Sequence, residues 1–433
     1  MKNLKNSYIL FCMIFVLLAS PSHAAHHKKT PTKSVVNHRT AKKTNSKKIE
    51  ALAEPKEEIL NSPEVKSDKM INDLQEAQFY FLLDADTKEV LLAKNPDARI
   101  PPSSMTKVMT AYVVFDQIKN GHVSFENQCM IGKDAWRKSG SSMFLNYGDI
   151  VTIDELLQGL LAVSGNDAAI ALAETTAGGI NNFVGLMNQK AKDLGFTNSH
   201  FKNPHGLYEE GHYMSVRDLA TLTSRIYSDF PQYSHYLGIQ EFTYRNIKQI
   251  NRNPLIKGNY EGILGGKTGH TDAGGYGVLG AVKRDDRMLI AVVNKVPTPK
   301  KRAALIVDLM DYGFENYNKL TLFNKDQEVT EIPTWLGVES QVKAATDREV
   351  SFNLPRAKSL DNINVTAKFK GPLYAPIAKG DRVGTLYVEI KGYKNLEYPL
   401  FAKESVDKAG YLKRINQILR YKMAGFFKLF DDK

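Results

Sequence analysis

The stretch IPPSSMTKVMTAYVV, residues 100–114, decides the fold of this chain. Its Ile-Pro-Pro start ends extended structure, because proline lacks the backbone donor that a strand needs. From Ser103 onward apolar residues recur at steps of three and four, which predicts a helix. Ser104 and Lys107 lie three residues apart on this helix and share one face, so the serine Oγ and the lysine Nζ can meet.

This pairing of residue types suits nucleophilic catalysis. A serine hydroxyl is a weak nucleophile without a base. Lysine serves as that base only when its pKa falls from about 10.4, and burial and a nearby cation both lower it. Backbone N–H groups at a helix start also favour developing negative charge. Ser-x-x-Lys alone is weak evidence, because roughly one or two occur by chance in a chain like this.

A second motif, Ser164-Gly165-Asn166, interrupts two apolar helical segments. A polar triplet at such a break can face a cleft, where Ser164 could relay a proton and Asn166 could hold a peptide amide. The alternative is a helix N-cap, since serine, asparagine and the following Asp167 all commonly start helices.

A third motif, Lys267-Thr268-Gly269, lies on a predicted strand. Lys267 can supply the cation that keeps Lys107 neutral and can attract a substrate carboxylate. Thr268 can hydrogen-bond that carboxylate, and Gly269 leaves room for a ligand backbone along the strand. The alternative is an ordinary lysine in a β-turn.

Around these motifs, strands are predicted at both ends of one domain and helices in its middle. A hairpin at 79–93 precedes the first motif, and strands at 265–271, 276–282 and 288–296 with a closing helix at 300–312 follow the third. Hairpins pair antiparallel, so the end segments can share one sheet. We therefore expect an α+β fold, in which an antiparallel sheet carries a helical lobe and the active site lies between the two lobes.

The whole chain divides into five predicted parts. Residues 1–24 read as a signal peptide, with a basic start, an apolar core at 8–19 and cleavage after Ala24; the alternative is an uncleaved anchor. Residues 25–72 are predicted to be a basic disordered linker, either a solvated spacer or a segment whose basic half touches anionic headgroups or anionic wall polymer. The catalytic domain is expected at 73–319, a small β-rich domain at 320–403 and an amphipathic helix at 404–433.

Charge and cysteine content exclude several classes of function. Much of the net charge of +11 sits in the linker, which lacks the interleaved aromatics of a nucleic-acid module. Only Cys129 would remain after removal of the signal peptide, so no internal disulfide is expected. The 10 histidines have no ligand-like spacing, so neither a metal nor another cofactor is predicted.

The order and spacing of the three motifs resemble those of low-molecular-mass penicillin-binding proteins, the D-alanyl-D-alanine carboxypeptidases. The similarity extends from about Phe79 to the C-terminus. It is carried by the stretches PPSSMTK (101–107), GSSMFL (140–145), SGNDA (164–168), NPHGL (203–207), KTGHT (267–271) and APIAKG (375–380). The resemblance implies a β-lactamase/transpeptidase-like catalytic domain, a C-terminal β-rich domain and a membrane-associating helix.

The resemblance also implies roles for the motif residues. Ser104 would attack the carbonyl between the two D-alanines of a peptidoglycan stem peptide, Lys107 would take its proton and Ser164 would shuttle a proton. Backbone N–H groups of Ser104 and His270 would form the oxyanion hole. Arg302 matches a family arginine near the substrate's terminal carboxylate, although a surface helix arginine is an equal alternative. The remaining substrate-binding residues would be Asn166, Lys267, Thr268 and Gly269.

Three other functions remain as alternatives for a protein with this scaffold, and the first is a β-lactamase. A β-lactamase needs a base for fast deacylation, but residues 195–207 contain no Glu or Asp. The other two alternatives are a D,D-endopeptidase and a non-catalytic wall-binding protein.

The expected partners are stem peptides, covalently bound β-lactams and the membrane surface, with a homodimer left open. The expected location is the periplasmic face of the inner membrane, as an exported, peripheral protein.

Overall fold

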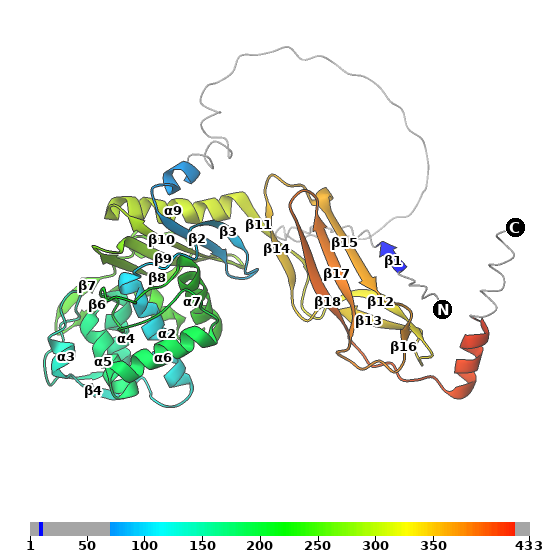
Figure 1. The fold of residues 1–433 in the computed structure, drawn as a ribbon, viewed down its shortest axis with the longest axis horizontal. Coiled ribbons are helices and arrows are strands. Elements are labelled where there is room, and N and C mark those ends of the chain that lie inside the picture. Colours follow the sequence, from blue (N-terminus) through cyan, green and yellow to red (C-terminus); the bar gives the residue numbers. More distant parts are fainter. Residues whose placement is uncertain (1–7, 12–69, 421–433) are drawn as a thin grey trace, which may run out of the picture. The chain divides into compact units, whose positions relative to one another are not determined.

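The computed structural model describes residues 8–11 and 70–420 of the chain (Figure 1). These residues form two compact units, which are described separately. The first comprises residues 70–322 together with 351–358, and the second comprises the other described residues, 8–11, 323–350 and 359–420. Most of the predicted signal peptide, the linker up to residue 69 and the end of the tail lie outside the described residues.

The first unit is built on a five-stranded antiparallel sheet with the order β3-β2-β10-β9-β8. Its strands are β2 (Phe79–Asp84), β3 (Val90–Lys94), β8 (Ile263–Thr271), β9 (Gly275–Arg284) and β10 (Arg287–Val296). β2 and β10 are neighbours although some 200 residues separate them in the sequence. This pairing confirms that the two ends of the domain share one sheet.

Alternate side chains of this sheet enter two different cores. On one face Phe81, Leu83 and Ile290 pack with the helical lobe. On the other face Tyr80, Leu82 and their neighbours pack under the long helix α9 (Pro299–Asn316), which lies along the sheet in Figure 1. A period of two thus buries both faces of the sheet, which explains why its central strands β2 and β10 are mostly apolar.

The helical lobe surrounds the buried helix α2 (Lys107–Lys119), in which every residue from Lys107 to Phe115 is buried. Thr152 and Glu155 form a reciprocal capping box at the start of α4. The other helices of this unit are α3 (Lys133–Trp136), α4 (Ile153–Ala162), α5 (Asn166–Ala177), α6 (Ile180–Asp193), α7 (Val216–Asp229) and α8 (Pro254–Lys257). Two small antiparallel sheets of two strands complete it: β4 (Gln128–Met130) with β5 (Ile150–Thr152), and β6 (Glu241–Tyr244) with β7 (Ile247–Ile250).

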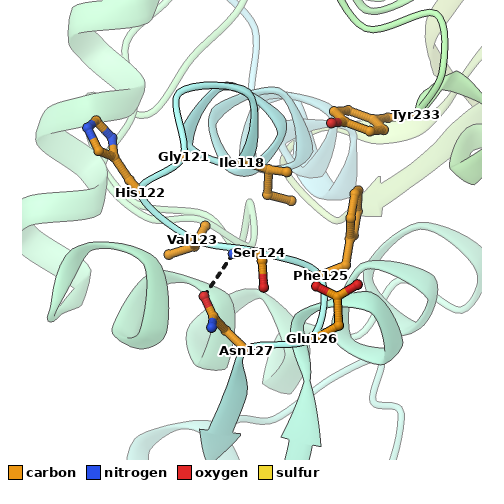
Figure 2. A pocket seen from close by; sticks show the side chains of 9 residues that line it. All are labelled: Ile118, Gly121, His122, Val123, Ser124, Phe125, Glu126, Asn127 and Tyr233. Atoms are coloured by element: carbon orange, nitrogen blue, oxygen red, sulfur yellow. Dashed lines mark hydrogen bonds between the residues drawn. The ribbon is translucent and has the colours of Figure 1, made fainter.

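A hollow of about 500 Å³ lies beyond the C-terminal end of α2 (Figure 2). Its walls come from residues 121–127 together with Ile118 and Tyr233. None of the residues of the three sequence motifs lines it, so we do not assign the chemistry to this hollow.

The second unit is a β-rich domain with a seven-stranded sheet in the order β1-β15-β17-β18-β13-β12-β16. β1 (Tyr8–Phe11), from the predicted signal peptide, pairs antiparallel with β15. The other strands are β12 (Glu328–Trp335), β13 (Gln341–Ala345), β15 (Ile363–Phe369), β16 (Leu373–Tyr374), β17 (Arg382–Ile390) and β18 (Lys394–Ala402). Residues 411–420 are helical, and the described chain ends there.

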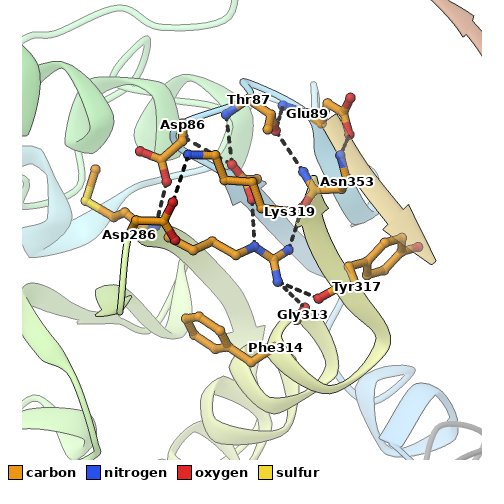
Figure 3. Close-up of polar contacts among 12 residues, drawn as sticks. Asp86, Thr87, Glu89, Asp286, Gly313, Phe314, Tyr317, Lys319 and Asn353 are labelled. Carbon is orange, nitrogen blue, oxygen red and sulfur yellow. Dashed lines mark hydrogen bonds and ion pairs between the residues drawn. The ribbon is translucent and has the colours of Figure 1, made fainter. Parts of the chain in front are cut away.

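Residues 351–358 belong to the first unit, although the sequence analysis assigns them to the C-terminal domain. They lie largely in β14 (Val350–Pro355), which pairs with β11 (Tyr317–Phe323). Figure 3 shows the polar contacts that hold this segment. The buried guanidinium of Arg287 donates to the Asp84 carboxylate at 2.8 Å and to Asn353 Oδ1 at 2.7 Å. It also donates to the carbonyls of Gly313 and Tyr317.

We expect Arg287→Met to lower the free energy of unfolding by roughly 3 kcal/mol, because it leaves a buried carboxylate without its cation. The matched control is Lys248→Met, which breaks the exposed 2.8 Å ion pair with Glu241 and should cost less than about 1 kcal/mol. Urea denaturation of both variants measures the difference. Equal losses in the two variants would contradict a structural role for the Arg287 contacts.

Candidate active site

The predicted serine–lysine pair forms at the start of α2. Residues 103–106 make a 3₁₀ turn, η2 (Ser103–Thr106), and the α-helix begins only at Lys107. The helix predicted from Ser103 therefore starts with a tighter turn, and Ser103 has a φ of 51°. Lys107 Nζ lies 3.0 Å from Ser104 Oγ, which is within hydrogen-bonding distance of a base and its nucleophile.

Two acceptors hold the Lys107 amine in place. Nζ donates to Asn166 Oδ1 at 2.7 Å and to the carbonyl of His205 at 2.8 Å. A neutral amine has two N–H donors and one lone pair. When these two contacts use both donors, the lone pair is left for the Ser104 hydroxyl proton. The geometry therefore fits an amine that accepts a proton from the serine.

Several causes lower the pKa of Lys107 far below its ordinary value. The largest is burial, because the side chain has no solvent exposure. The positive charges of Lys267 and Arg252 act in the same direction, and the Asp167 carboxylate opposes them. Lys267 therefore has the effect on Lys107 that the sequence analysis expects, and burial contributes more.

The second motif does not act as a helix cap. Helix α5 begins at Asn166, and its N-cap residue Gly165 makes no side-chain capping bond. Asn166 instead accepts from Lys107 and donates to the carbonyl of Ser139 at 2.8 Å. Ser164 has a φ of 68°, and its buried Oγ has no hydrogen-bond partner within the described part of the chain. A strained residue with an unsatisfied hydroxyl is typical of a functional site.

Asp167 anchors the loop beside this motif. Its buried carboxylate accepts from the backbone N–H groups of Met143 and Leu145, at 3.1 and 3.2 Å, and from the Ser142 hydroxyl at 2.6 Å. The sequence analysis treats Asp167 only as a helix starter. Its position next to Asn166 is the one signal that could have identified it.

The third motif lies on β8, beside the 3₁₀ turn that carries Ser104. A Cβ on Gly269 would lie 3.0 Å from the Pro102 carbonyl oxygen and 3.1 Å from Ser103 Cβ. Glycine therefore allows close packing of the strand on the nucleophile's turn, a reason that differs from the one expected from sequence. Thr268 is buried, and Lys267 Nζ donates to its carbonyl at 3.1 Å.

A group of cations surrounds Lys267. Burial, together with Arg252 and Arg302, lowers the pKa of Lys267 to about 7. Arg302 is partly buried, and its Nε has no hydrogen-bond partner among the described residues, which disfavours the surface-helix alternative. Arg252 donates to Ser141 Oγ at 3.0 Å. Sequence reasoning missed Arg252, because a single arginine after a strand carries no motif.

His270 and Tyr276 line the end of the third motif. Their rings stack with centroids 3.9 Å apart, and the Arg302 guanidinium lies 5.9 Å from the Tyr276 ring centroid. Hydrogen bonds thus connect Lys107 with Ser104 and Asn166, and the charge of Lys267 acts on Lys107. The Tyr276 ring contacts both His270 and Arg302. No cluster of His, Cys, Asp and Glu residues suited to a metal occurs among the residues that the structure describes.

The antiparallel sheet, the helical lobe and the serine–lysine pair define a class, the β-lactamase/transpeptidase-like fold. Penicillin-binding protein 5 from Haemophilus influenzae shares it with a TM-score of 0.72 and 33% identity, over 77% of this chain and 98% of that one. A variant of the DD-transpeptidase of Streptomyces K15 matches over 55% of this chain and 98% of its own, with a TM-score of 0.52 and 27% identity. The fold expected from the sequence is therefore confirmed.

Family models match nearly all of the described chain. The D-alanyl-D-alanine carboxypeptidase model covers residues 66–298, and the penicillin-binding protein 5 C-terminal domain model covers residues 317–408. D-alanyl-D-alanine carboxypeptidase DacF of Bacillus subtilis is 34% identical over 78% of this chain and 87% of its own length. DacC of Escherichia coli is 33% identical over 81% and 90%. The chain belongs to the D-alanyl-D-alanine carboxypeptidases, and it is a serine-type hydrolase of peptidoglycan metabolism.

Proposed function

We propose that Ser104 is the nucleophile that removes the terminal D-alanine from peptidoglycan pentapeptides. The observation that carries this proposal is the 3.0 Å contact between Ser104 Oγ and the buried Lys107 amine. Lys107 takes the hydroxyl proton as Oγ attacks the carbonyl of the penultimate D-alanine. The amide bond breaks, the leaving nitrogen receives a proton by way of Ser164, and D-alanine departs. Water then hydrolyses the ester on Ser104, which regenerates the hydroxyl.

The other motif residues bind the substrate in this proposal. Lys267 and Arg302 attract the terminal carboxylate. The positive charges of Arg252 and Arg302, which lower the pKa of Lys267, support an anion-binding site there. Thr268 donates to the same carboxylate, and Asn166 holds both Lys107 and the peptide. Arg252, exposed beside Lys267, adds a further cation at the entrance. The backbone N–H groups of Ser104 and His270 stabilise the oxyanion.

Mass spectrometry of a muropeptide digest tests the activity. We expect pentapeptides incubated with the purified protein to lose one alanine. Cleaved cross-linked dimers with intact pentapeptides would instead indicate an endopeptidase. Unchanged substrate would indicate a wall-binding protein without catalysis.

The same serine is expected to react with β-lactams, whose strained amide resembles the D-Ala-D-Ala terminus. A related solved structure, penicillin-binding protein D2 of Listeria monocytogenes, is described in its ampicillin-bound form. Attack of Ser104 opens the lactam ring. The amine released from the lactam stays attached to the acyl group, whereas D-alanine departs, so water hydrolyses the β-lactam ester slowly. Slow turnover of nitrocefin would agree with this, and rapid turnover would favour a β-lactamase.

The C-terminal helix is proposed to hold the exported enzyme on the periplasmic face of the inner membrane. No helix among residues 8–11 and 70–420 is long and apolar enough to cross a bilayer. The described part of the helix exposes large apolar side chains, namely Tyr411, Leu412, Ile415, Ile418 and Leu419. An exposed apolar face with basic neighbours suits a helix that lies in the membrane surface.

We expect deletion of the residues after Ser405 to move the protein from the membrane fraction to the soluble fraction, with D-alanine release retained. Fractionation of cells that express either form measures this. Membrane association that survives the deletion would refute the anchor and would favour retention of the signal segment.

A further inference from the structure

An exposed aromatic pair lies in the helical lobe, outside the motif residues. Trp136, at the end of α3, is 47% exposed, and Tyr147, in the loop before β5, is 58% exposed. Their ring centroids are 6.3 Å apart. Single exposed aromatic residues are common, but two exposed rings in contact form an apolar patch of the kind that marks interaction surfaces.

Each ring of the pair carries its own cation. Lys133 Nζ lies 5.9 Å from the centroid of Tyr147, and the Arg137 guanidinium lies 5.8 Å from that of Trp136. Such contacts fix the orientation of a ring. We call Lys133, Trp136, Arg137 and Tyr147 the aromatic platform. It combines apolar ring surface with groups that donate hydrogen bonds.

The platform is joined to the active site by a short length of chain. Only three residue steps separate Trp136 from Ser139, a span of at most about 11 Å between their Cα atoms. The Ser139 carbonyl accepts from Asn166, whose Oδ1 accepts from Lys107. The Asn166 backbone N–H donates to the Ser141 carbonyl at 2.7 Å. This path of hydrogen bonds and the span of chain together keep the Trp136 Cα within about 24 Å of Ser104 Oγ. An extended stem peptide of five residues spans about 17 Å, and the sugar rings attached to it can cover the remainder.

We propose that the aromatic platform binds the glycan strand to which the stem peptide is attached. This inference rests on the proposed function, because it assumes a peptidoglycan substrate. Sugar rings present apolar C–H faces that can pack on Trp136 and Tyr147. Their hydroxyl and N-acetyl oxygens accept hydrogen bonds from Lys133 and Arg137. A protein partner would also suit aromatic and arginine side chains, but the glycan strand is tethered to the stem peptide, and the platform is within its reach when that peptide occupies the site.

The first test compares two substrates of D-alanine release. One is a free pentapeptide, and the other is the same pentapeptide on an N-acetylglucosamine–N-acetylmuramic acid disaccharide. We expect the wild-type protein to favour the disaccharide form in kcat/KM. Trp136→Ala combined with Tyr147→Ala should lower the ratio of the two kcat/KM values by about tenfold. The control Tyr374→Ala removes a 71% exposed tyrosine of the other unit and should leave the ratio unchanged.

The second test measures binding directly. The chain has 2 tryptophans, so Trp335→Phe makes Trp136 the sole tryptophan, whose emission is observed with excitation that selects tryptophan over tyrosine. Titration with peptide-free glycan strands should shift its emission, and this shift should disappear when Tyr147 is replaced by alanine. Both variants must still react with labelled penicillin, which shows that they are folded. An unchanged ratio of the two kcat/KM values in the double variant, with no fluorescence response, would overturn the glycan proposal and would favour a protein partner. Failure of the wild type to release D-alanine from either substrate would instead overturn the proposed function itself.

Discussion

Replacement of Ser104 by alanine is expected to abolish both D-alanine release and covalent labelling by penicillin. The change removes the only atom that forms the acyl ester in the proposed mechanism, so the loss in kcat should be about 10⁴-fold or more. The fold should persist, because Lys107 keeps its bonds to Asn166 Oδ1 and the His205 carbonyl. Release of D-alanine and fluorescent-penicillin labelling measure the two losses, and thermal unfolding checks the fold.

The adjacent serine provides the control. Ser103 is buried, and its Oγ lies 2.9 Å from Thr271 Oγ1, so it makes a structural contact. We expect Ser103→Ala to retain penicillin labelling. Labelling that survives in Ser104→Ala, or that disappears only in a folded Ser103→Ala, would place the nucleophile elsewhere.

The sequence predicts the catalytic sheet and its motifs well because both follow local rules. Strand periodicity at 79–84 and 287–296 follows from the need to fill two cores, one on each face of the sheet. Ser-x-x-Lys reflects the geometry of a single helical turn. Local patterns of this kind can be read without knowledge of distant contacts.

Contacts between distant segments are what the sequence does not reveal. Arg252 acts on Lys107 and Lys267 through space, and its surroundings in the sequence form no recognisable pattern. The segment 351–358 looks like any other short strand, and only contacts made in the folded chain, such as that of Asn353 with Arg287, assign it to the catalytic unit. Gly269 is expected from the sequence to leave room for a ligand, whereas the structure shows that it allows β8 to pack on η2.

The lysine base gives the second large effect. We expect Lys107→Met and Lys107→Arg to slow acylation by similar factors, roughly 10²–10⁴-fold. Methionine cannot accept a proton, and arginine keeps its positive charge at every accessible pH. If Lys107 acted only as a positive charge, the arginine variant would retain most of the rate. The acylation rate with penicillin, measured by stopped flow, separates these two roles.

The pH dependence of the wild-type protein tests the same assignment. The folded pKa of Lys107 lies well below its ordinary value, so the amine is neutral above that pKa and becomes protonated as the pH falls. Acylation should therefore decline on the acidic side. Lys267 has a pKa of about 7, so its charge is present below pH 7 and is lost above it. Attraction of a substrate carboxylate should weaken on the alkaline side, which gives a bell-shaped profile of kcat/KM.

The bell-shaped profile has an acidic limb, which we assign to Lys107, and an alkaline limb, which we assign to Lys267. Removal of the Lys267 charge should affect the two limbs differently. Lys267→Met eliminates a positive neighbour that lowers the pKa of Lys107, so the acidic limb should move to higher pH. The alkaline limb should disappear, since its titrating group is gone. An acidic limb that stays in place in Lys267→Met would mean that burial and Arg252 keep Lys107 neutral without Lys267. An acidic limb that persists in Lys107→Met would show that some other group titrates there and that Lys107 is not the base.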